Sequence, residues 1–235
     1  MADPVEPPEA TDPNEARRLA ALLQEGVGSL RRIKAIRTLA RETLRVDRRL
    51  GAPDLVQRIA TYRAAGGRIR IETYPAEDSD AAGPPLRALV LPGFDPAAHA
   101  ATDAASRALR EARLEPRNVL AHLGEKSHVI RHVHPAADGS GSHGAGPAPL
   151  NSREEAVELD LPEESARYLF DPVTHLCAER IDSAFRTRTH YLEWHPVDGI
   201  ATPFLEIVET EGSAAEIRML AIAYDLDLPD TLFAH

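Results

Sequence analysis

The chain has 235 residues, of which 43% are hydrophobic and 27% are charged. These values suit a folded domain with a sizeable core and argue against a wholly disordered chain. The formal net charge of −10 disfavours a broad phosphate-binding surface, so nucleic acid is not expected as a partner. No apolar run reaches the roughly 18 residues of a transmembrane span. The single cysteine, Cys177, excludes an intramolecular disulfide.

The N-terminal part of the chain predicts a helix. Asp12 can cap its first turn, and Pro13 suits the first helical position. Apolar residues then recur at helical spacing as far as Ile33. Gly26 and Gly28 weaken the middle of this stretch, so we expect the helix to break there.

From residue 36 onward the apolar period changes to two, which predicts strands. The clearest is residues 68–74, where Ile69 and Ile71 share one face and arginines occupy the other. The central part of the chain predicts, in order, a strand at 86–91, helices at 96–114 and 118–123, and a strand at 127–134. The last third predicts six strands with short connections, at 156–161, 166–170, 176–185, 187–195, 200–208 and 214–223.

The segments outside these elements define the domain organisation. Residues 1–11 are acidic and proline-rich, which predicts a disordered tail. Residues 138–149 are rich in Gly, Ser and Pro and predict a flexible loop. Because strand patterns resume after that loop, we expect residues 12–235 to form one domain, an antiparallel meander with an inserted helical segment.

The sequence contains no recognisable catalytic constellation. It lacks the Gly-x-Ser-x-Gly elbow, and Cys177 falls inside an expected strand. Residues 139–144 are glycine-rich but lack the lysine and the strand–loop–helix context of a phosphate-binding loop. We therefore expect a binding or carrier protein rather than an enzyme.

Three histidines are the one candidate for a metal site. His128, His132 and His134 share a face of the expected strand. Neighbouring residues of one face lie about 6.6 Å apart, so His132 and His134 could reach one ion, whereas His128 lies about 13 Å from His132. Solvent-facing histidines are the favoured interpretation and no cofactor is expected. A histidine-based metal-binding protein stays a second alternative.

Four motifs, in this order, resemble the LolA-like outer-membrane lipoprotein-sorting (lipoprotein carrier) family. They are the helix end at 30–39, the aromatic strand with Asp-Pro-x-Thr at 168–176, the Val-Asp-Gly turn and following strand at 197–204, and the chain end at 226–233. The resemblance implies an α+β, mainly β fold: a curved antiparallel sheet, an unclosed half-barrel, covered by helices on its concave side. It also implies an arginine that latches the helices to the sheet, for which Arg45, Arg68 and Arg70 are equal candidates.

The resemblance implies a function as well. Members of the family hold acyl chains or other apolar groups between sheet and helices, so an apolar ligand or a lipid-modified protein is the expected partner. The residues expected to line the ligand site are Ile69, Ile71, Leu89, Leu91, Tyr191, Trp194 and Phe204. The alternative is a protein-interaction subunit or adaptor with the same fold, whose interior is filled by its own side chains and which binds a protein partner.

The expected compartment depends on how the chain begins. Exported members of the family carry a signal segment, and the resemblance implies a periplasmic or otherwise exported protein. The acidic, proline-rich start of this chain has neither the basic residues nor the apolar run of a secretory signal. If Met1 is the native start, we expect a cytoplasmic location instead.

Overall fold

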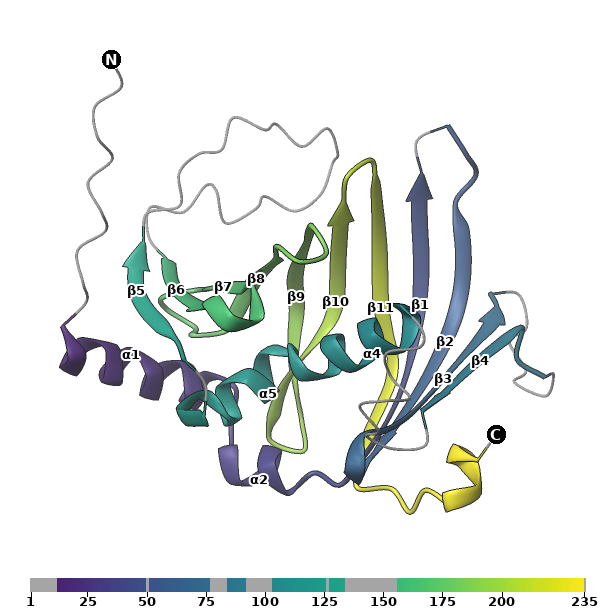
Figure 1. The fold of residues 1–235 in the computed structure, drawn as a ribbon, viewed down its shortest axis with the longest axis horizontal. Helices are drawn as coiled ribbons and strands as arrows, with labels where there is room; N and C mark the ends of the chain where they lie inside the picture. The colour runs from purple at the N-terminus through teal and green to yellow at the C-terminus, as the bar shows by residue number, and fades with distance from the viewer. Residues whose placement is uncertain are drawn as a thin grey trace.

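The computed structural model describes residues 12–49, 51–76, 84–91, 103–125, 127–133 and 156–234. The expected tail at 1–11, the expected loop at 138–149 and His134 lie outside these residues. The described residues form an 11-stranded sheet in which every pair of neighbours is antiparallel. The sheet is not closed, because β4 and β5 stand at its two edges (Figure 1). This confirms the expected mainly β, half-barrel fold.

The sheet consists of two meanders joined at one strand pair. Its order is β4-β3-β2-β1-β11-β10-β9-β8-β7-β6-β5, so that β1 pairs with β11 in the middle. The first meander comprises β1 (Thr38–Arg49), β2 (Leu55–Ala64), β3 (Arg68–Pro75) and β4 (Arg87–Leu91). The second comprises β5 (Val129–Val133), β6 (Ala156–Leu161), β7 (Ala166–Phe170), β8 (Cys177–Asp182), β9 (Thr187–Val197), β10 (Ile200–Thr210) and β11 (Ser213–Tyr224).

Helices cross one face of this sheet (Figure 1). The α-helices are α1 (Pro13–Gly26), α2 (Leu30–Ala35), α4 (Asp103–Arg113) and α5 (Pro116–Ala121). Short 3₁₀ turns are η1 (Ala65–Gly67), η2 (Leu123–Glu125), η4 (Pro162–Glu164) and η5 (Asp230–Phe233). In the described part of the chain, no helix combines the length and the hydropathy that a bilayer span needs.

The N-terminal helix begins and breaks as its sequence predicts. The Asp12 carboxylate accepts a hydrogen bond from the Asn14 amide at 2.9 Å, and Pro13 follows it. Between α1 and α2, Gly28 has a φ of 98° and forms a β-bridge with Ile200. A Cβ atom at Gly28 would lie 2.2 Å from the Gly199 carbonyl oxygen. Glycine is therefore required at position 28 for two reasons, its positive φ and the close approach of the β9–β10 hairpin.

The expected strand at 176–185 is shorter in the structure, where β8 ends at Asp182. The Asp182 carboxylate accepts hydrogen bonds from the Ala184 and Phe185 amides at 3.0 and 3.3 Å, which closes a turn. Arg186 has a φ of 51° in the same turn. A side chain that hydrogen-bonds to the backbone just after it favours a turn over further strand pairing. The chain therefore turns after Asp182 instead of continuing β8.

One large core lies beneath α1, α2 and α5. Leu19 and Leu23 of α1, and Val119 and Leu120 of α5, are almost completely buried. They pack against the second meander, whose contribution to this core is Ile130, Val157, Leu159, Leu161, Ala166, Tyr168, Phe170, Cys177, Tyr191, Ile200 and Tyr224.

Candidate functional site

α4 bridges two opposite walls of the curved sheet. On one side, Leu109 and Ala112 of α4 pack against a small apolar cluster formed by β3 and β4. On the other side, Arg110 of α4 binds Asp182 at the end of β8. Because β3 and β8 are far apart in the strand order, the sheet must curve around α4 for both contacts to form.

The apolar side of this bridge contains four residues that the sequence singled out. Ile69 and Leu91 are buried, at 3% and 6% exposure, and Ile71 and Leu89 are half-buried. Ile69 pairs with Leu91, and Ile71 pairs with Leu89, across β3 and β4. The four side chains thus form one patch on the face that α4 covers. Whether they contact a ligand remains a prediction.

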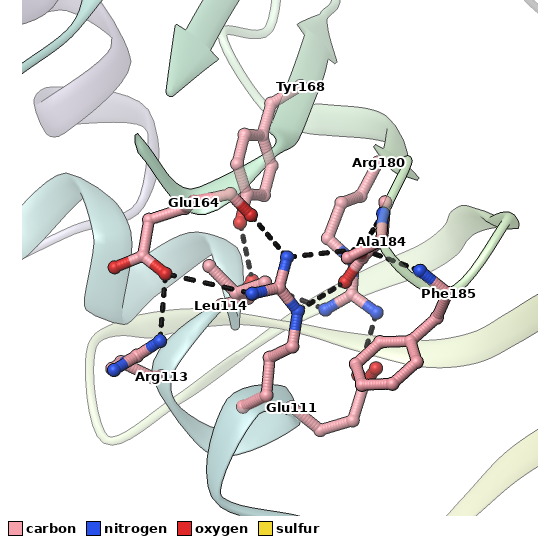
Figure 2. Close-up of polar contacts among 10 residues, drawn as sticks. Glu111, Arg113, Leu114, Glu164, Tyr168, Arg180, Ala184 and Phe185 are labelled. Atoms are coloured by element: carbon pink, nitrogen blue, oxygen red, sulfur yellow. Dashed lines mark hydrogen bonds and ion pairs between the residues drawn. The ribbon is translucent and has the colours of Figure 1, made fainter. Parts of the chain in front are cut away.

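The polar side of the bridge is a network of charged groups (Figure 2). The Arg110 Nε atom donates to the Asp182 carboxylate at 2.9 Å, and its Nη2 atom donates to the Glu164 carbonyl oxygen. Asp182 is completely buried, so this ion pair is shielded from solvent. Arg113 adds a contact to the Glu164 carboxylate at 2.8 Å from an exposed position.

A second arginine reaches α4 from the sheet. Arg180 of β8 is 3% exposed and donates to the Glu111 carboxylate at 2.7 Å. The Tyr168 hydroxyl donates to the Leu114 carbonyl oxygen at the end of the helix, at 2.9 Å. Phe185 lies under the guanidinium of Arg110, with 5.4 Å between the carbon and the ring centre. α4 is thus held on this side by polar contacts.

A cavity lies beneath the junction of α4 and α5. Its lining residues are Arg41, Glu115, Pro116, Arg117, Tyr191, Trp194, Ala201, Thr202, Pro203, Glu206, Met219 and Ile222. The volume that the centres of water molecules could occupy in this cavity is about 30 Å³. Since one water needs about 10–15 Å³ on this measure, the cavity has room for about two waters. It is too small for an acyl chain in this closed arrangement.

Three arginines converge on one carboxylate beside this cavity. Glu115 accepts contacts from Arg117 at 2.6 Å, Arg63 at 2.9 Å and Arg41 at 3.2 Å. Burial alone would raise the pKa of Glu115, but these three guanidiniums outweigh it and hold that pKa well below its usual range. Glu115 therefore stays ionised and ties the α4–α5 junction to β1 and β2.

The pKa of a second acidic group in the cavity wall is shifted in the opposite direction. Glu206 of β10 lies opposite Tyr191 of β9 in the ladder. Burial raises the pKa of Glu206, and the nearby Arg41 offsets this only in part. The cavity wall therefore contains one carboxylate that is strongly held in its charged form and one that burial pushes toward its neutral form.

Two of the three aromatic residues singled out by sequence line the cavity. Tyr191 and Trp194 both line the cavity, with ring centres 6.2 Å apart. Strict alternation would put residues 191 and 194 on opposite faces. Glu193 has a φ of 53° and interrupts the alternation, which lets both side chains point inward. Phe204 is outside the cavity lining, and its ring packs edge-on against His195 at 4.9 Å.

The three arginines named as latch candidates form their described polar contacts away from α4 and α5. Arg45 pairs with Asp47 on its own strand at 2.7 Å. Arg68 stacks on Phe233 in η5, and Arg70 donates to the Leu232 carbonyl oxygen at 3.0 Å. In the described part of the chain, none of the three forms a hydrogen bond or ion pair with α4 or α5. Arg180 of the sheet binds α4, and Arg41 and Arg63 bind Glu115 at the α4–α5 junction.

Of the three histidines on the expected strand, His128 and His132 lie in the described part of the chain and His134 lies outside it. His128 and His132 are exposed. The His132 Nε2 atom lies 3.4 Å from a Glu15 carboxylate oxygen of α1. Among the residues that the structure describes, no group of three or more His, Cys, Asp or Glu side chains has the geometry of a metal site.

Sequence reasoning missed the charged groups of the cavity, although β1 carried a signal for them. Leu39 belongs to the core, so Arg41 two positions later must share its inward face. A charge at an inward position of a strand is unusual and calls for a partner. The partner, Glu115, lies in a helical segment far along the chain, which the strand pattern alone does not reveal.

Comparison with known proteins identifies the architecture. No family model matches the chain, and no curated protein sequence does. A LolA superfamily protein from Nitrosomonas europaea superposes with a TM-score of 0.52 at 11% identity, over 94% of this chain and 97% of that one. The chain has a LolA-like fold. A DUF1329 family protein from Desulfovibrio piger shares it, with a TM-score of 0.50 at 15% identity and coverage of 96% and 98%.

This similarity extends over almost the whole chain and confirms the resemblance that the four sequence motifs indicated. At identities this low it establishes the LolA-like fold alone.

Proposed function

We propose that the protein is a non-enzymatic carrier that holds an apolar ligand, an acyl chain or the lipid of a lipid-modified protein, between its curved sheet and α4. The observation that carries this proposal is the way α4 is held. Among the described residues, its apolar contacts with β3 and β4 come from Leu109 and Ala112, and its opposite side is fixed by ion pairs to β8. If this helix moved away, an acyl chain could take the place of these two side chains against β3 and β4.

The patch of Ile69, Ile71, Leu89 and Leu91 would then be the floor of the ligand site. With α4 displaced, these side chains would be exposed to water, and each Å² of apolar surface that a ligand covers is worth about 25 cal/mol. Tyr191 and Trp194 would extend this floor toward the cavity. Phe204, predicted as a further contact, is not used in this proposal because its ring packs on His195.

A carrier of this kind would work where lipid-modified proteins or free lipids cross an aqueous space. The LolA superfamily neighbour supports this by its fold. We therefore propose an exported, periplasmic location and a lipid-modified partner. A fusion of the native N-terminus to a reporter that is active only after export would test the location.

One observation favours the adaptor alternative. The cavity under the α4–α5 junction has room for only about two waters, and the large core is filled by the protein's own side chains. A LolA-like domain that never opens would be a rigid protein-binding module. The two functions differ in whether α4 leaves the sheet.

The experiment that separates them measures lipid directly. Protein purified without detergent is analysed by native mass spectrometry and then titrated with a fluorescent fatty acid. A carrier should show bound lipid or saturable binding, and Leu89→Gln should weaken binding at least several-fold. Ile207→Gln is the matched control, because Ile207 follows the cavity-lining Glu206 and so faces the other side of the sheet. No lipid, no binding and a stoichiometric protein complex on size exclusion would establish the adaptor instead.

A further inference from the structure

The charges around the cavity are not balanced. Arg41, Arg63 and Arg117 surround a single ionised carboxylate, Glu115. Glu206 is the second carboxylate of the lining, and burial disfavours its charged form. The region therefore carries an excess of positive charge whether or not Glu206 is ionised. Unbalanced buried charge is costly, so a site of this kind favours a negatively charged partner.

Hydrogen-bond donors are also left over. The Nε atoms of Arg41 and Arg63 are buried and have no hydrogen-bond partner within the described residues. Arg41 is part of the cavity lining, and its Nη1 atom already binds Glu115 at 3.2 Å. A guanidinium is a planar array of five donors that matches carboxylate and phosphate oxygens, and the unpartnered Nε shows that Glu115 does not use all the donors of Arg41.

The cavity has polar and apolar walls in the arrangement that an amphiphile needs. Arg41 and Arg117 provide guanidinium groups, and the Thr202 hydroxyl donates to the Ile200 carbonyl oxygen at 3.2 Å and lies 3.1 Å from the Tyr224 hydroxyl. The rest of the wall is largely apolar and includes Tyr191, Trp194, Met219 and Ile222. Room for about two waters is also room for two head-group oxygens, while the chain needs the space under α4.

We infer that the cavity receives the anionic head group of the carried molecule, so that the ligand is an amphiphile with a carboxylate or phosphate head rather than a neutral lipid. Arg41 and Arg117 bind the head, and the chain lies against the apolar patch of β3 and β4. This inference rests on the carrier function proposed above and specifies its ligand class.

The test compares 16-carbon ligands that differ only in the head group. Palmitate, hexadecyl phosphate, hexadecanol and hexadecyltrimethylammonium are titrated at pH 8, below the concentrations at which they aggregate, and displacement of a fluorescent lipid is measured. Both anions should bind at least about tenfold more tightly than the alcohol, because hydrogen bonds to charged groups are strong. The cation should bind more weakly than the alcohol. The tighter of the two anions identifies the head group.

Two matched variants test whether the preference for anionic ligands depends on Arg41. Arg41→Gln should reduce the affinity for the preferred anion to near that for the alcohol and leave the affinity for the alcohol unchanged. Arg45→Gln removes an arginine from the same face of the same strand, and Arg45 contacts Asp47 instead of the cavity. That control should alter neither affinity. Thermal melting of both variants checks folding, and the comparison of ligands on the unmodified protein does not depend on either variant.

The outcomes separate this inference from the carrier function. Equal binding of anions, alcohol and cation would overturn the anionic-head inference and leave the carrier standing. An anion preference that Arg41→Gln does not reduce would also overturn it. Failure of every 16-carbon ligand to bind would overturn the carrier function itself.

Discussion

The two meanders of the sheet are stabilised in different ways. The second meander is covered by α1, α2 and α5 and shares with them a large core of fully buried side chains. On the first meander, the apolar cluster of β3 and β4 has two buried members, Ile69 and Leu91, within the described residues. The helix over that cluster, α4, is held to β8, on the other side of the curved sheet, by ion pairs that involve arginines. One half of the molecule is thus fixed by apolar packing, and the described contacts that hold α4 to β8 are polar.

The largest expected effect tests the packed half. Phe170→Ala removes a ring that is completely buried in the core, and should lower the free energy of unfolding by about 4 kcal/mol. Leu89→Ala, in the half-buried patch under α4, should lower it by about 1 kcal/mol, since only part of that side chain is removed from water. Urea denaturation of both variants measures the difference. Similar losses would show that both halves are packed alike.

Glu115→Gln should have the next largest effect. It leaves Arg41, Arg63 and Arg117 together without their shared carboxylate, and should cost about 3 kcal/mol at pH 7, the lower end of the range for breaking a buried ion pair. The pKa of Glu115 is lower in the folded protein than its usual 4.5. Its contribution to stability is therefore complete above about pH 4.5 and declines as the pH falls toward the folded-state pKa.

The pH dependence of stability shows whether the loss in Glu115→Gln comes from the ionised carboxylate. The stability difference between the wild type and Glu115→Gln should be constant from pH 7 to about pH 5 and shrink below that. Circular dichroism melts at several pH values measure it. A difference that grows as the pH falls would contradict the assignment of a lowered pKa to Glu115.

Arg110→Ala should have an intermediate effect that is local to α4. The Asp182 carboxylate would lose its arginine but keep the Ala184 and Phe185 amides, so we expect a loss of about 2 kcal/mol. Hydrogen exchange should speed up in α4 and stay unchanged in α5. The control is Arg113→Ala, whose side chain is 59% exposed and should cost less than about 1 kcal/mol. Faster exchange throughout α1 and α5 would mean that α4 does not open alone.

The smallest effect is expected for Glu206→Gln, and its sign is opposite. Burial raises the pKa of Glu206 in the folded protein, so this group favours folding most at low pH and loses that contribution as the pH rises from about 4.5 through the folded-state pKa. Gln cannot ionise and avoids that loss. The variant should melt a few degrees higher than the wild type at pH 7, and this gain should disappear near pH 4. A lower melting temperature at pH 7 would indicate that the charged form is stabilised.

Sequence reasoning recovered the local structure well, because local signals determine it. Asp12 and Pro13 predicted the start of α1, and the alternation at Ile69 and Ile71 predicted both β3 and its inward face. These features depend on residues that are close in the chain. The half-barrel was implied by the resemblance of four motifs to a known family.

The parts that sequence reasoning missed depend on distant residues or on single backbone angles. The pairing of Arg41 with Glu115 joins positions that are 74 residues apart. The turn of Trp194 into the cavity depends on the positive φ of Glu193, which no pattern of apolar residues encodes. Such features require the register of the strands, which a single sequence does not contain.

The pairing of β1 with β11 also has a consequence for synthesis on the ribosome. Thr38–Arg49 is translated long before its neighbour Ser213–Tyr224, and at about 5–20 residues per second the wait is on the order of ten seconds or more. During that time one edge of β1 has backbone donors and acceptors without their final partner. The first meander can therefore form early but can join the second only when the last long strand emerges. A circular permutant in which β11 directly precedes β1 would remove this wait, and should fold faster and depend less on chaperones.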